Sequence, residues 1–459
     1  MEKDVDNLDI ILQQVLECIE SKKYSHARDL LIENNAVDIA EILEEVLEET
    51  DVEKTTVLFR ILPKDIAVDV FSYLPPEDQI AIIGAITDKE ISYIMDELAF
   101  DDMIDVLEEL PANVVDKILE KTSKDERKLI NTFLNYPDTC AGSLMTPDYI
   151  TLRKDMTVGE ALAYIKREGM DSETIYTCYV KDEGRKLLGI VSLRTLVIAD
   201  DFTPIEELMH TDIVRVNVYD DQEEVSDIFT KYGFLAIPVV DNEGRIVGII
   251  TVDDILDVIE EETTEDFERM AGVMADSDRD YLDMSVWQHV KSRIPWLFLL
   301  MCSYVITGGI IARFEVVLSK VISLVAYMPM LMGTGGNSGS QSATLVIRGM
   351  SVDEIDLDDF LKVLLKELGV SIIIGLALSS LNFIRIYYIE KQGVMVALTV
   401  CAAMLVIVVA AKLIGSMLPM LAKRIGIDPA LMATPTISSL TDMVSVITYF
   451  TLAKIFLNI

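Results

Sequence analysis

The feature that most constrains the fold is a series of five hydrophobic segments in residues 287–459. They lie near 287–312, 316–347, 360–388, 393–421 and 429–457. Each has at least the roughly 20 residues that a helix needs to cross a bilayer. The sequence therefore predicts a polytopic α-helical membrane domain with five transmembrane helices, surrounded by membrane lipid. Because five is an odd number, the two ends of the chain are expected on opposite sides of the membrane.

Charge separates this region from the rest of the chain. Residues 287–459 hold 13 Lys and Arg against 10 Asp and Glu, whereas the preceding 286 residues hold 26 against 67. So acidic a region does not suit the phosphates of nucleic acid. It suits cations as ligands, although it also serves solubility alone. The start, MEKDVDNLDI, has no basic and apolar signal-peptide pattern. We therefore expect a multi-pass protein of the cell membrane, whose N-terminal domains are cytoplasmic.

The first 135 residues have the periodicity of successive amphipathic helices. A weak repeat of 36 residues relates LPKDIAVDVFSYLP at 62–75 to LAFDDMIDVLEELP at 98–111. Repeats of this length suggest a small α-solenoid of stacked helix pairs. An ordinary helical bundle is the alternative. We assign residues 1–135 to a cytosolic helical N domain.

Residues 136–262 contain a duplicated α/β pattern. LMTPDYITLRKDMTVGEALAYI and LMHTDIVRVNVYDDQEEVSDIF each lead to a strand that ends in GIVS or GIIT. This duplication resembles a tandem pair of CBS modules, which implies ATP or another adenine nucleotide as a possible regulatory ligand. Scaffolding without a ligand is the alternative. The acid-rich residues 263–286 that follow are expected to form a connecting, plug-like helix.

The second hydrophobic segment contains a polar stretch, PMLMGTGGNSGSQSATLVIRG at 329–349. Polar, glycine-rich backbone at membrane depth is tolerated only where it is buried in protein or faces a water-filled path. Its glycines are expected to let another backbone approach and to free carbonyl groups toward that path. Asn337 and Gln341 share one helical face. Close helix packing alone is the alternative.

The last hydrophobic segment contains a carboxylate, Asp442. Acids inside membrane spans are costly and usually functional. Pro435 is expected to break a backbone hydrogen bond and leave carbonyls near 431–434 without partners, an arrangement typical of cation sites. All these candidate ligands are oxygen atoms, which favours Mg²⁺ before Ca²⁺ or Mn²⁺. An Asp satisfied by nearby hydroxyls, with a structural role only, is the alternative.

These motifs, with IDPAL at 427–431 and SSLTD at 438–442, resemble the MgtE family of magnesium channels along essentially the whole chain. The resemblance implies a homodimer whose Mg²⁺-selective pore takes up Mg²⁺ down its electrochemical gradient and is closed by Mg²⁺ bound to the acidic cytosolic domains. It makes Asp442 the pore carboxylate, with Asn337 and Gly333 beside the ion. It also implies a set of regulatory acids: Asp101, Asp102, Asp221, Glu223, Asp254, Asp257, Glu262, Glu265, Asp266 and Asp428.

Lys412 departs from the expected pattern, because a neutral residue is expected in the fourth segment. We expect its side chain to reach toward the inner membrane interface. Enzyme activity is not expected and no catalytic residues are assigned, because the sequence contains neither H-E-x-x-H nor a Walker A lysine. A Na⁺- or H⁺-coupled divalent cation exchanger remains the alternative function.

Overall fold

The computed structural model describes residues 2–170, 172–274, 281–282, 284–314, 321–352 and 354–458, with side chains from residue 8 onward. The chain divides into two compact units, Met1–Ile259 and Glu260–Ile459. Each is described by itself.

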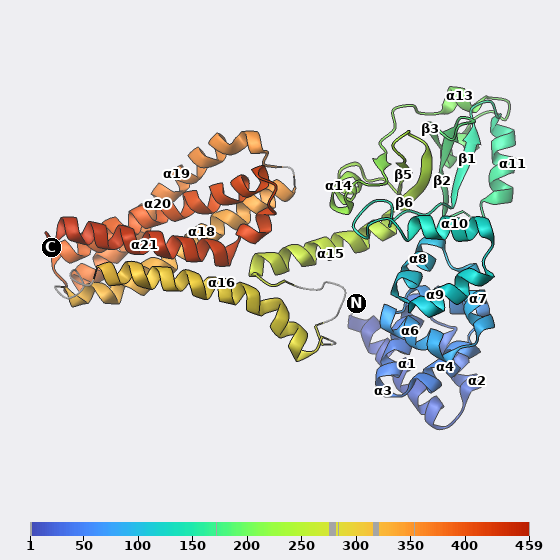
Figure 1. Cartoon of the computed structure of the whole chain (residues 1–459), viewed down its shortest axis with the longest axis horizontal. Coiled ribbons are helices and arrows are strands. Elements are labelled where there is room, and N and C mark those ends of the chain that lie inside the picture. Colours follow the sequence, from blue (N-terminus) through green and yellow to red (C-terminus); the bar gives the residue numbers. More distant parts are fainter. Residues whose placement is uncertain are drawn as a thin grey trace. The chain divides into compact units, whose positions relative to one another are not determined.

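The first unit begins with short helices that follow one another directly (Figure 1, blue to cyan). Their bounds are α1 (Glu2–Glu20), α2 (Tyr24–Leu31), α3 (Ala36–Glu49), α4 (Val52–Ile61), α5 (Lys64–Ser72), α6 (Pro76–Ala85), α7 (Asp88–Glu97), α8 (Phe100–Glu109), α9 (Ala112–Lys121) and α10 (Lys124–Phe133). Alternate helices pack on one another, as α4 does on α6 and α6 on α8. The prediction of a helical N domain is confirmed.

The helices from α4 to α10 each begin twelve residues after the one before. The 36-residue repeat is therefore three helices, and the expected repeat unit of a helix pair is wrong. A proline is the N-cap of α5, α6 and α9, a place where its missing N–H costs nothing. The leucine before each of these prolines, Leu62, Leu74 or Leu110, is buried. Helix starts thus recur every twelve residues from α4 to α10, a spacing that admits only one helix of about ten residues.

Two α/β modules of the same topology follow. The first contains β1 (Tyr149–Arg153), α11 (Val158–Glu168), β2 (Thr174–Lys181), β3 (Leu187–Ser192), α12 (Leu193–Ile198) and α13 (Ile205–Leu208); the second contains β4 (Val216–Asn217), α14 (Gln222–Tyr232), β5 (Ala236–Val240) and β6 (Ile246–Thr251). In each sheet the first strand is parallel to the second, which is antiparallel to the third. The duplication read from the sequence is confirmed.

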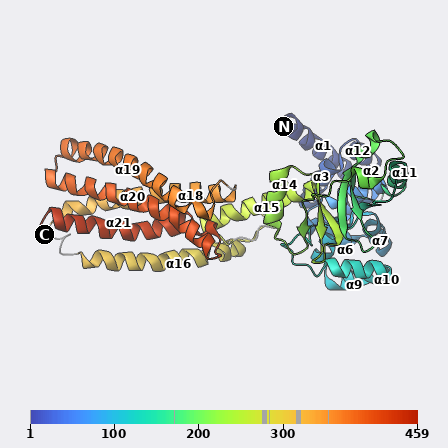
Figure 2. The ribbon, with the colours of Figure 1, turned by 90° about the horizontal axis from the view of Figure 1, so that it is seen from above.

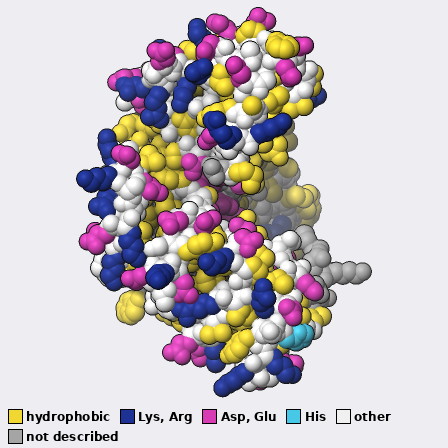
Figure 3. All heavy atoms as spheres, turned by 90° about the vertical axis from the view of Figure 1, so that its right-hand side faces the viewer, with side chains coloured by type: hydrophobic (Ala, Val, Ile, Leu, Met, Phe, Trp, Pro, Cys, Tyr) yellow, Lys and Arg dark blue, Asp and Glu magenta, His cyan; other side chains and the backbone are white. Residues whose placement is uncertain are grey.

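One hydrophobic core joins the N-terminal helices to the second module. Phe133 of α10 packs edge-on against Phe100 of α8, with ring centroids 4.7 Å apart. The same core contains Met145 and Phe229 of the modules. On the face of this unit shown in Figure 3, acidic and basic side chains are interspersed rather than separated.

Helix α15 (Val252–Ala271) leaves β6 and continues without interruption past residue 262, where the connecting helix was expected to begin. Ile255 and Val258 are buried in the first unit, whereas Met270 packs in the second unit against a cluster that includes Ile347 and Ile437. Residues 275–280 and 283 of the expected connecting segment lie outside the described residues.

The second unit is helical. Its long helices are α16 (Val286–Arg313), α18 (Met328–Ser351), α19 (Phe360–Ile384), α20 (Val394–Arg424) and α21 (Thr434–Phe456), with short turns η1 (Ile322–Tyr327), η2 (Leu357–Asp359), η3 (Arg385–Ile389) and η4 (Pro429–Met432). Figures 1 and 2 show the long helices side by side. Helix α20 packs on α18, α19 and α21, and α16 packs on α21.

Within the described residues, three helical segments are long and apolar enough to cross a membrane: Val286–Arg313, Val394–Arg424 and Pro429–Phe456. The first is the least covered by protein, because only 6% of its most apolar window is buried. The prediction of a C-terminal helical membrane region is therefore confirmed with three candidate spans. Residues 316–320 of the expected second span lie outside the described part of the chain.

Candidate cation sites

Helix α18 presents two different faces. On one face Gly335, Gly336 and Gly339 are buried against α20 and α21. A methyl group at Gly335 would lie 2.8 Å from Ser445 Oγ, and one at Gly339 would lie 2.6 Å from Ile437 Cγ2. These glycines therefore have the close-packing role that was the alternative reading of the motif.

The other face of α18 carries Gly333, Asn337 and Gln341, which are all exposed. Nothing lies within 4 Å of the position where a Cβ of Gly333 would be. The backbone is helical throughout Met328–Ser351, so the expectation that glycine carbonyls leave the helix is wrong. The polar groups that this face offers are the side-chain amides.

Asp442 lies on α21, level with Gly335 and Gly336 of α18. Gly336 contacts Ser438 and Gly335 contacts Ser445, and these two residues flank Asp442 along the helix. The side chain is half-buried. Its carboxylate makes no hydrogen bond or ion pair with any residue that the structure describes. The alternative of an Asp satisfied by neighbouring hydroxyls is therefore wrong for this structure.

Pro435 lies in the first turn of α21 and does not interrupt it. The carbonyl of Leu431 accepts a hydrogen bond from Thr436 Oγ1 (3.1 Å), and that of Ala433 accepts one from the Ile437 N–H (3.1 Å). The expected break with unpaired carbonyls is wrong at these two positions, because proline at a helix start removes no intrahelical bond. The hydroxyls are also engaged: Thr441 donates to the Ser438 carbonyl, and Ser439 bonds to Ser303 of α16.

Lys412 of α20 is only 4% exposed, so the expectation that it reaches the membrane interface is wrong. Its Nζ donates to Ser342 Oγ of α18 (3.2 Å). The Ser342 hydroxyl in turn donates to Glu367 Oε2 of α19 (2.6 Å). A buried ammonium and a half-buried carboxylate are thus linked through one hydroxyl across three helices.

The predicted regulatory acids of the first unit gather where α8 approaches the start of α15. Burial and the negative charge of Asp254, Glu173 and Asp102 raise the pKa of Asp101 to about 8. Burial, opposed by a hydrogen bond from Thr251 (2.6 Å), raises the pKa of Asp254 to about 6. Burial and the negative charge of Asp253 raise the pKa of Asp102. We call Asp101, Asp102, Glu173, Asp253 and Asp254 the first acid cluster.

Four further predicted acids gather in the second unit. Burial raises the pKa of Glu265, with Glu262, Asp428 and Asp266 adding repulsion against the attraction of Arg269. Burial and Asp428 raise the pKa of Asp266. Arg269 Nη1 donates to Asp428 Oδ2 at 2.7 Å and is also paired with Glu265. We call Glu262, Glu265, Asp266 and Asp428 the second acid cluster.

The remaining predicted acids have other surroundings. Asp221 is the N-cap of α14, where its Oδ1 accepts a hydrogen bond from the Glu223 N–H (3.0 Å). Asp257 is an exposed residue of α15, beyond Asp253 and Asp254 along the helix.

Sequence reasoning missed Glu173, Asp253 and Arg269. Asp253 adjoins a predicted residue, and Arg269 follows Glu265 by one helical turn, so both had a local signal. Glu173 had none, because it comes from a loop before β2. Among the described residues, no three His, Cys, Asp or Glu side chains are arranged closely enough to hold a metal ion.

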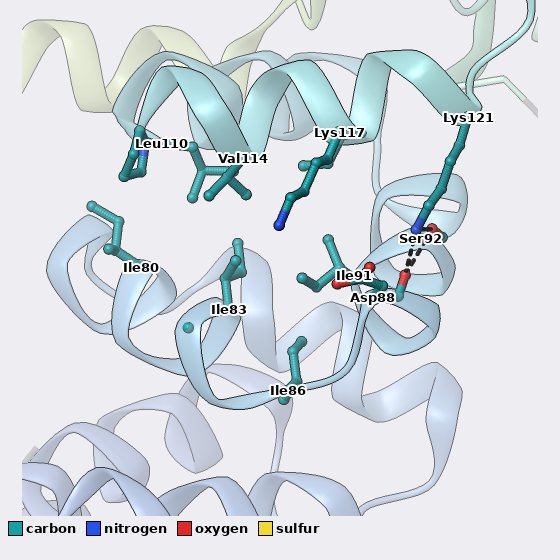
Figure 4. Close-up of a pocket in the computed structure, with 13 residues that line it drawn as sticks. Ile80, Ile83, Ile86, Asp88, Ile91, Ser92, Leu110, Val114, Lys117 and Lys121 are labelled. Atoms are coloured by element: carbon teal, nitrogen blue, oxygen red, sulfur yellow. Dashed lines mark hydrogen bonds between the residues drawn. The ribbon is translucent and has the colours of Figure 1, made fainter.

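A cavity of about 280 Å³ lies elsewhere, among the short helices of the N domain (Figure 4). It is lined mainly by apolar residues, with Lys117 pointing into it. Lys121 closes one side by donating to the Asp88 carbonyl (3.1 Å) and Ser92 Oγ (3.3 Å). It contains none of the predicted site residues.

The helical membrane region and the unpaired carboxylate within it define the class of the protein as a membrane cation transporter. Family models agree: "MgtE intracellular N domain" matches residues 34–139, "CBS domain" matches 141–201 and 205–261, and MgtE, "Divalent cation transporter", matches 328–452. The magnesium transporter MgtE of Thermus thermophilus is 37% identical over 96% of this chain and all of its own length. The magnesium transporter MgtE of Bacillus subtilis is 30% identical over 98% of this chain and 98% of its own length. The chain belongs to the MgtE family of magnesium transporters.

Solved structures match the cytosolic part. The cytosolic domain of the Mg²⁺ channel MgtE in complex with ATP is 35% identical, with a TM-score of 0.50 over 54% of this chain and 99% of that one. The soluble part of a magnesium transporter is 28% identical, with the same TM-score over 56% of this chain and 99% of that one. An enzyme, the inosine-5'-monophosphate dehydrogenase of Methanocaldococcus jannaschii, matches only 25% of this chain. The full-length relatives are transporters.

Proposed function

We propose that this protein is a Mg²⁺-selective channel that takes up Mg²⁺ down its electrochemical gradient and closes when Mg²⁺ binds to its acidic cytosolic regions. The observation that carries the proposal is the half-buried Asp442 carboxylate, which has no partner among the described residues. A carboxylate left unpaired in a membrane helix is costly unless a cation uses it. Asn337 and Gln341 offer further oxygen ligands on the exposed face of α18.

The ligand set favours Mg²⁺ as the ion. Carboxylate and amide oxygens are hard donors, and Mg²⁺ keeps several of its waters, so one carboxylate and a few amides suffice. Gly333 leaves room beside them, because no atom lies within 4 Å of its missing side chain. An inside-negative potential supplies roughly 4.6 kcal/mol for each divalent ion per 100 mV. Uptake then needs no enzymatic energy source.

The two acid clusters are the proposed sensor. Raised carboxyl pKa values show that negative charge is unfavourable where these acids stand together. Mg²⁺ between them removes that repulsion and stabilises the packed form. Weak carboxylate sites bind with affinities on the order of 10⁻⁴–10⁻³ M, the range that suits a cation held near millimolar concentration. Helix α15 carries acids of both clusters, and it transmits the presence or absence of bound Mg²⁺ to the membrane helices.

The proposed assembly is a homodimer in the cell membrane, with one pore and cytoplasmic N-terminal domains. Its domains are those expected from the sequence: 1–135, 136–262, 263–286 and 287–459. Helices α18 and α19 are proposed as two further spans, in addition to the three candidate spans, which makes five in all. The two helices have 24 and 25 residues. At a rise of 1.5 Å per residue, the length of each helix exceeds the roughly 30 Å thickness of a bilayer's hydrocarbon core. ATP is proposed as a regulatory ligand of the CBS pair, on the precedent of the relative crystallised with it.

The test is electrical recording from purified protein in lipid, with Mg²⁺ on the cytoplasmic side raised from zero to about 10 mM, well above the expected site affinity. We expect a current that reverses at the Mg²⁺ equilibrium potential and stops at millimolar Mg²⁺. Asp442→Asn should abolish it, whereas Lys454→Met, an exposed change on the same helix, should not. Mg²⁺ uptake only under a Na⁺ or H⁺ gradient, without current, would make the protein an exchanger instead.

A further inference from the structure

The strongest feature that the proposed function does not use is the link between Lys412, Ser342 and Glu367, which we call the buried charge chain. Lys412 is 4% exposed and Ser342 fully buried. The ammonium donates to the Ser342 hydroxyl (3.2 Å), which donates to the Glu367 carboxylate (2.6 Å). Burying a charge inside a membrane helix bundle is costly, and here the two opposite charges compensate each other through one hydroxyl.

The middle residue of the buried charge chain, Ser342, lies on the helix that carries the candidate ion path, α18. Ser342 directly follows Gln341 in α18 and comes five residues after Asn337. At 1.5 Å per residue, Ser342 is about 7.5 Å from Asn337 along the helix axis. Ser342 is buried, whereas Asn337 and Gln341 are exposed. The buried charges and the path thus lie beside different faces of one helix.

Both charges are hydrogen-bonded to Ser342, so they lie close enough to the exposed face of α18 to act on a cation there. Where water and salt do not intervene, a charge within about 10 Å of a divalent ion changes its binding strongly, because the effective dielectric constant is far below that of water. A balanced pair contributes little net field, whereas either charge alone contributes much. The pair therefore sets how tightly the path holds its ion.

The geometry points to Lys412 and Glu367 as an electrostatic tuning pair for Mg²⁺ in the transport path. Neither residue is a ligand of the ion. Lys412 offsets the attraction that Glu367 would otherwise add, so that Mg²⁺ binds weakly enough to leave. Ser342 holds the two charges in register across α18, α19 and α20. This inference rests on the proposed function, because it needs the ion path beside Asn337 and Gln341.

The test measures Mg²⁺ flux into liposomes as a function of Mg²⁺ concentration for Lys412→Met, Glu367→Gln and the double variant. Lys412→Met leaves Glu367 unbalanced, so we expect the half-saturating concentration to fall about threefold or more and the maximal flux to fall as well. Glu367→Gln leaves Lys412 unbalanced, so the half-saturating concentration should rise by a similar factor. The double variant should return close to the parent.

Opposite shifts from the two single variants, with recovery in the double variant, are the signature of charge balance. Lys423→Met, which removes an exposed lysine from the same helix, is the matched control and should shift nothing. Lys412→Arg keeps the charge and should retain the parent half-saturation. If Lys412→Met does not fold, the rise with Glu367→Gln and its reversal in the double variant carry the test.

Two outcomes overturn the inference. Single variants that lower the melting temperature but leave the half-saturating concentration unchanged would give the chain a structural role only. Single variants that shift it in the same direction would exclude electrostatic tuning. Failure of the proposed function is separate, because Asp442→Asn would then keep full flux whatever these variants do.

Discussion

Arg269 Nη1 lies 2.7 Å from Asp428 Oδ2, so that the last turn of α15 is joined to the loop before α21 by an ion pair within the second unit. The same guanidinium is paired with Glu265. A tethered cation therefore already occupies part of the second acid cluster, where Mg²⁺ is proposed to bind. The arrangement suggests that Arg269 holds α15 in its packed position when Mg²⁺ is absent.

If the protein is the proposed channel, Arg269→Gln is therefore expected to raise its open probability at zero Mg²⁺. The pair is partly solvent-exposed, with 39% and 27% of its two side chains accessible, so its contribution is modest, about 0.5–1 kcal/mol. That corresponds to about a two- to fivefold change in the ratio of closed to open channels. Recording open probability in the presence of a chelator measures it. Arg269→Lys should keep most of the parent behaviour, and an unchanged open probability in Arg269→Gln would contradict the idea.

The first acid cluster predicts a pH dependence of stability. The pKa of Asp101 is raised to about 8 and that of Asp254 to about 6, from about 3.9 in an unfolded chain. Because the folded state binds more protons than the unfolded state between about pH 4 and 8, these groups favour folding at low pH. That contribution is lost as the pH rises through 6 and 8. Without Mg²⁺, thermal unfolding of residues 1–259 should therefore shift to lower temperature across this range.

Asp101→Asn tests the source of that effect. An amide has the shape of the protonated acid at every pH, so the variant should melt higher than the parent at pH 8 without Mg²⁺ and should depend less on pH. It should also gain less stability from added Mg²⁺. The substitution Asp105→Asn, one turn away on α8 and exposed, serves as the comparison. A variant that keeps the full pH dependence of the parent would rule out Asp101 as its cause.

Replacing a glycine of α18 by alanine is expected to have a different effect on the packed face than on the exposed face. A methyl group at Gly339 would lie 2.6 Å from Ile437 Cγ2 and 3.1 Å from the Ala411 carbonyl oxygen, so Gly339→Ala should destabilise the second unit by about 1–3 kcal/mol. Gly333→Ala meets no atom within 4 Å and should leave the melting temperature unchanged. It should reduce Mg²⁺ flux if Gly333 borders the ion. Melting in detergent and liposome flux separate the two effects, and equal destabilisation by both would contradict the assignment of faces.

Asp221 offers a test of helix capping against ion binding. Asp221→Ala removes the N-cap of α14 and should cost about 1 kcal/mol of stability, whereas Asp221→Ser keeps a capping oxygen and removes the charge. If Asp221 is a regulatory ligand, closure by Mg²⁺ should weaken equally in both variants. If its role is capping alone, Asp221→Ser should close at the parent Mg²⁺ concentration. Current recorded during Mg²⁺ titration distinguishes these results.

Much of the architecture was determined by the sequence alone, because its signals are local. Apolar segments, the duplicated module with its GIVS and GIIT strand ends, and the run of acids before residue 270 each specify an element without reference to its neighbours. The sequence itself singled out Asp442, and the family resemblance added its proposed role in the pore and the proposed regulatory acids. The leucine–proline pairs at 62–63, 74–75 and 110–111 were also present in the sequence, but the 36-residue repeat concealed the twelve-residue spacing of the helix starts.

Only the tertiary structure decided what each polar group faces. The motif 329–349 does not reveal that Gly335 and Gly339 pack against other helices while Asn337 stays open, since both sets lie in the same turns. Nor does it reveal that Ser342 joins Lys412 to Glu367, which are 45 residues apart in sequence. The place of Glu173 in the first acid cluster was likewise decided by the tertiary structure. Burial and charge pairing depend on elements that meet in space, and a chain read in order carries no record of those meetings.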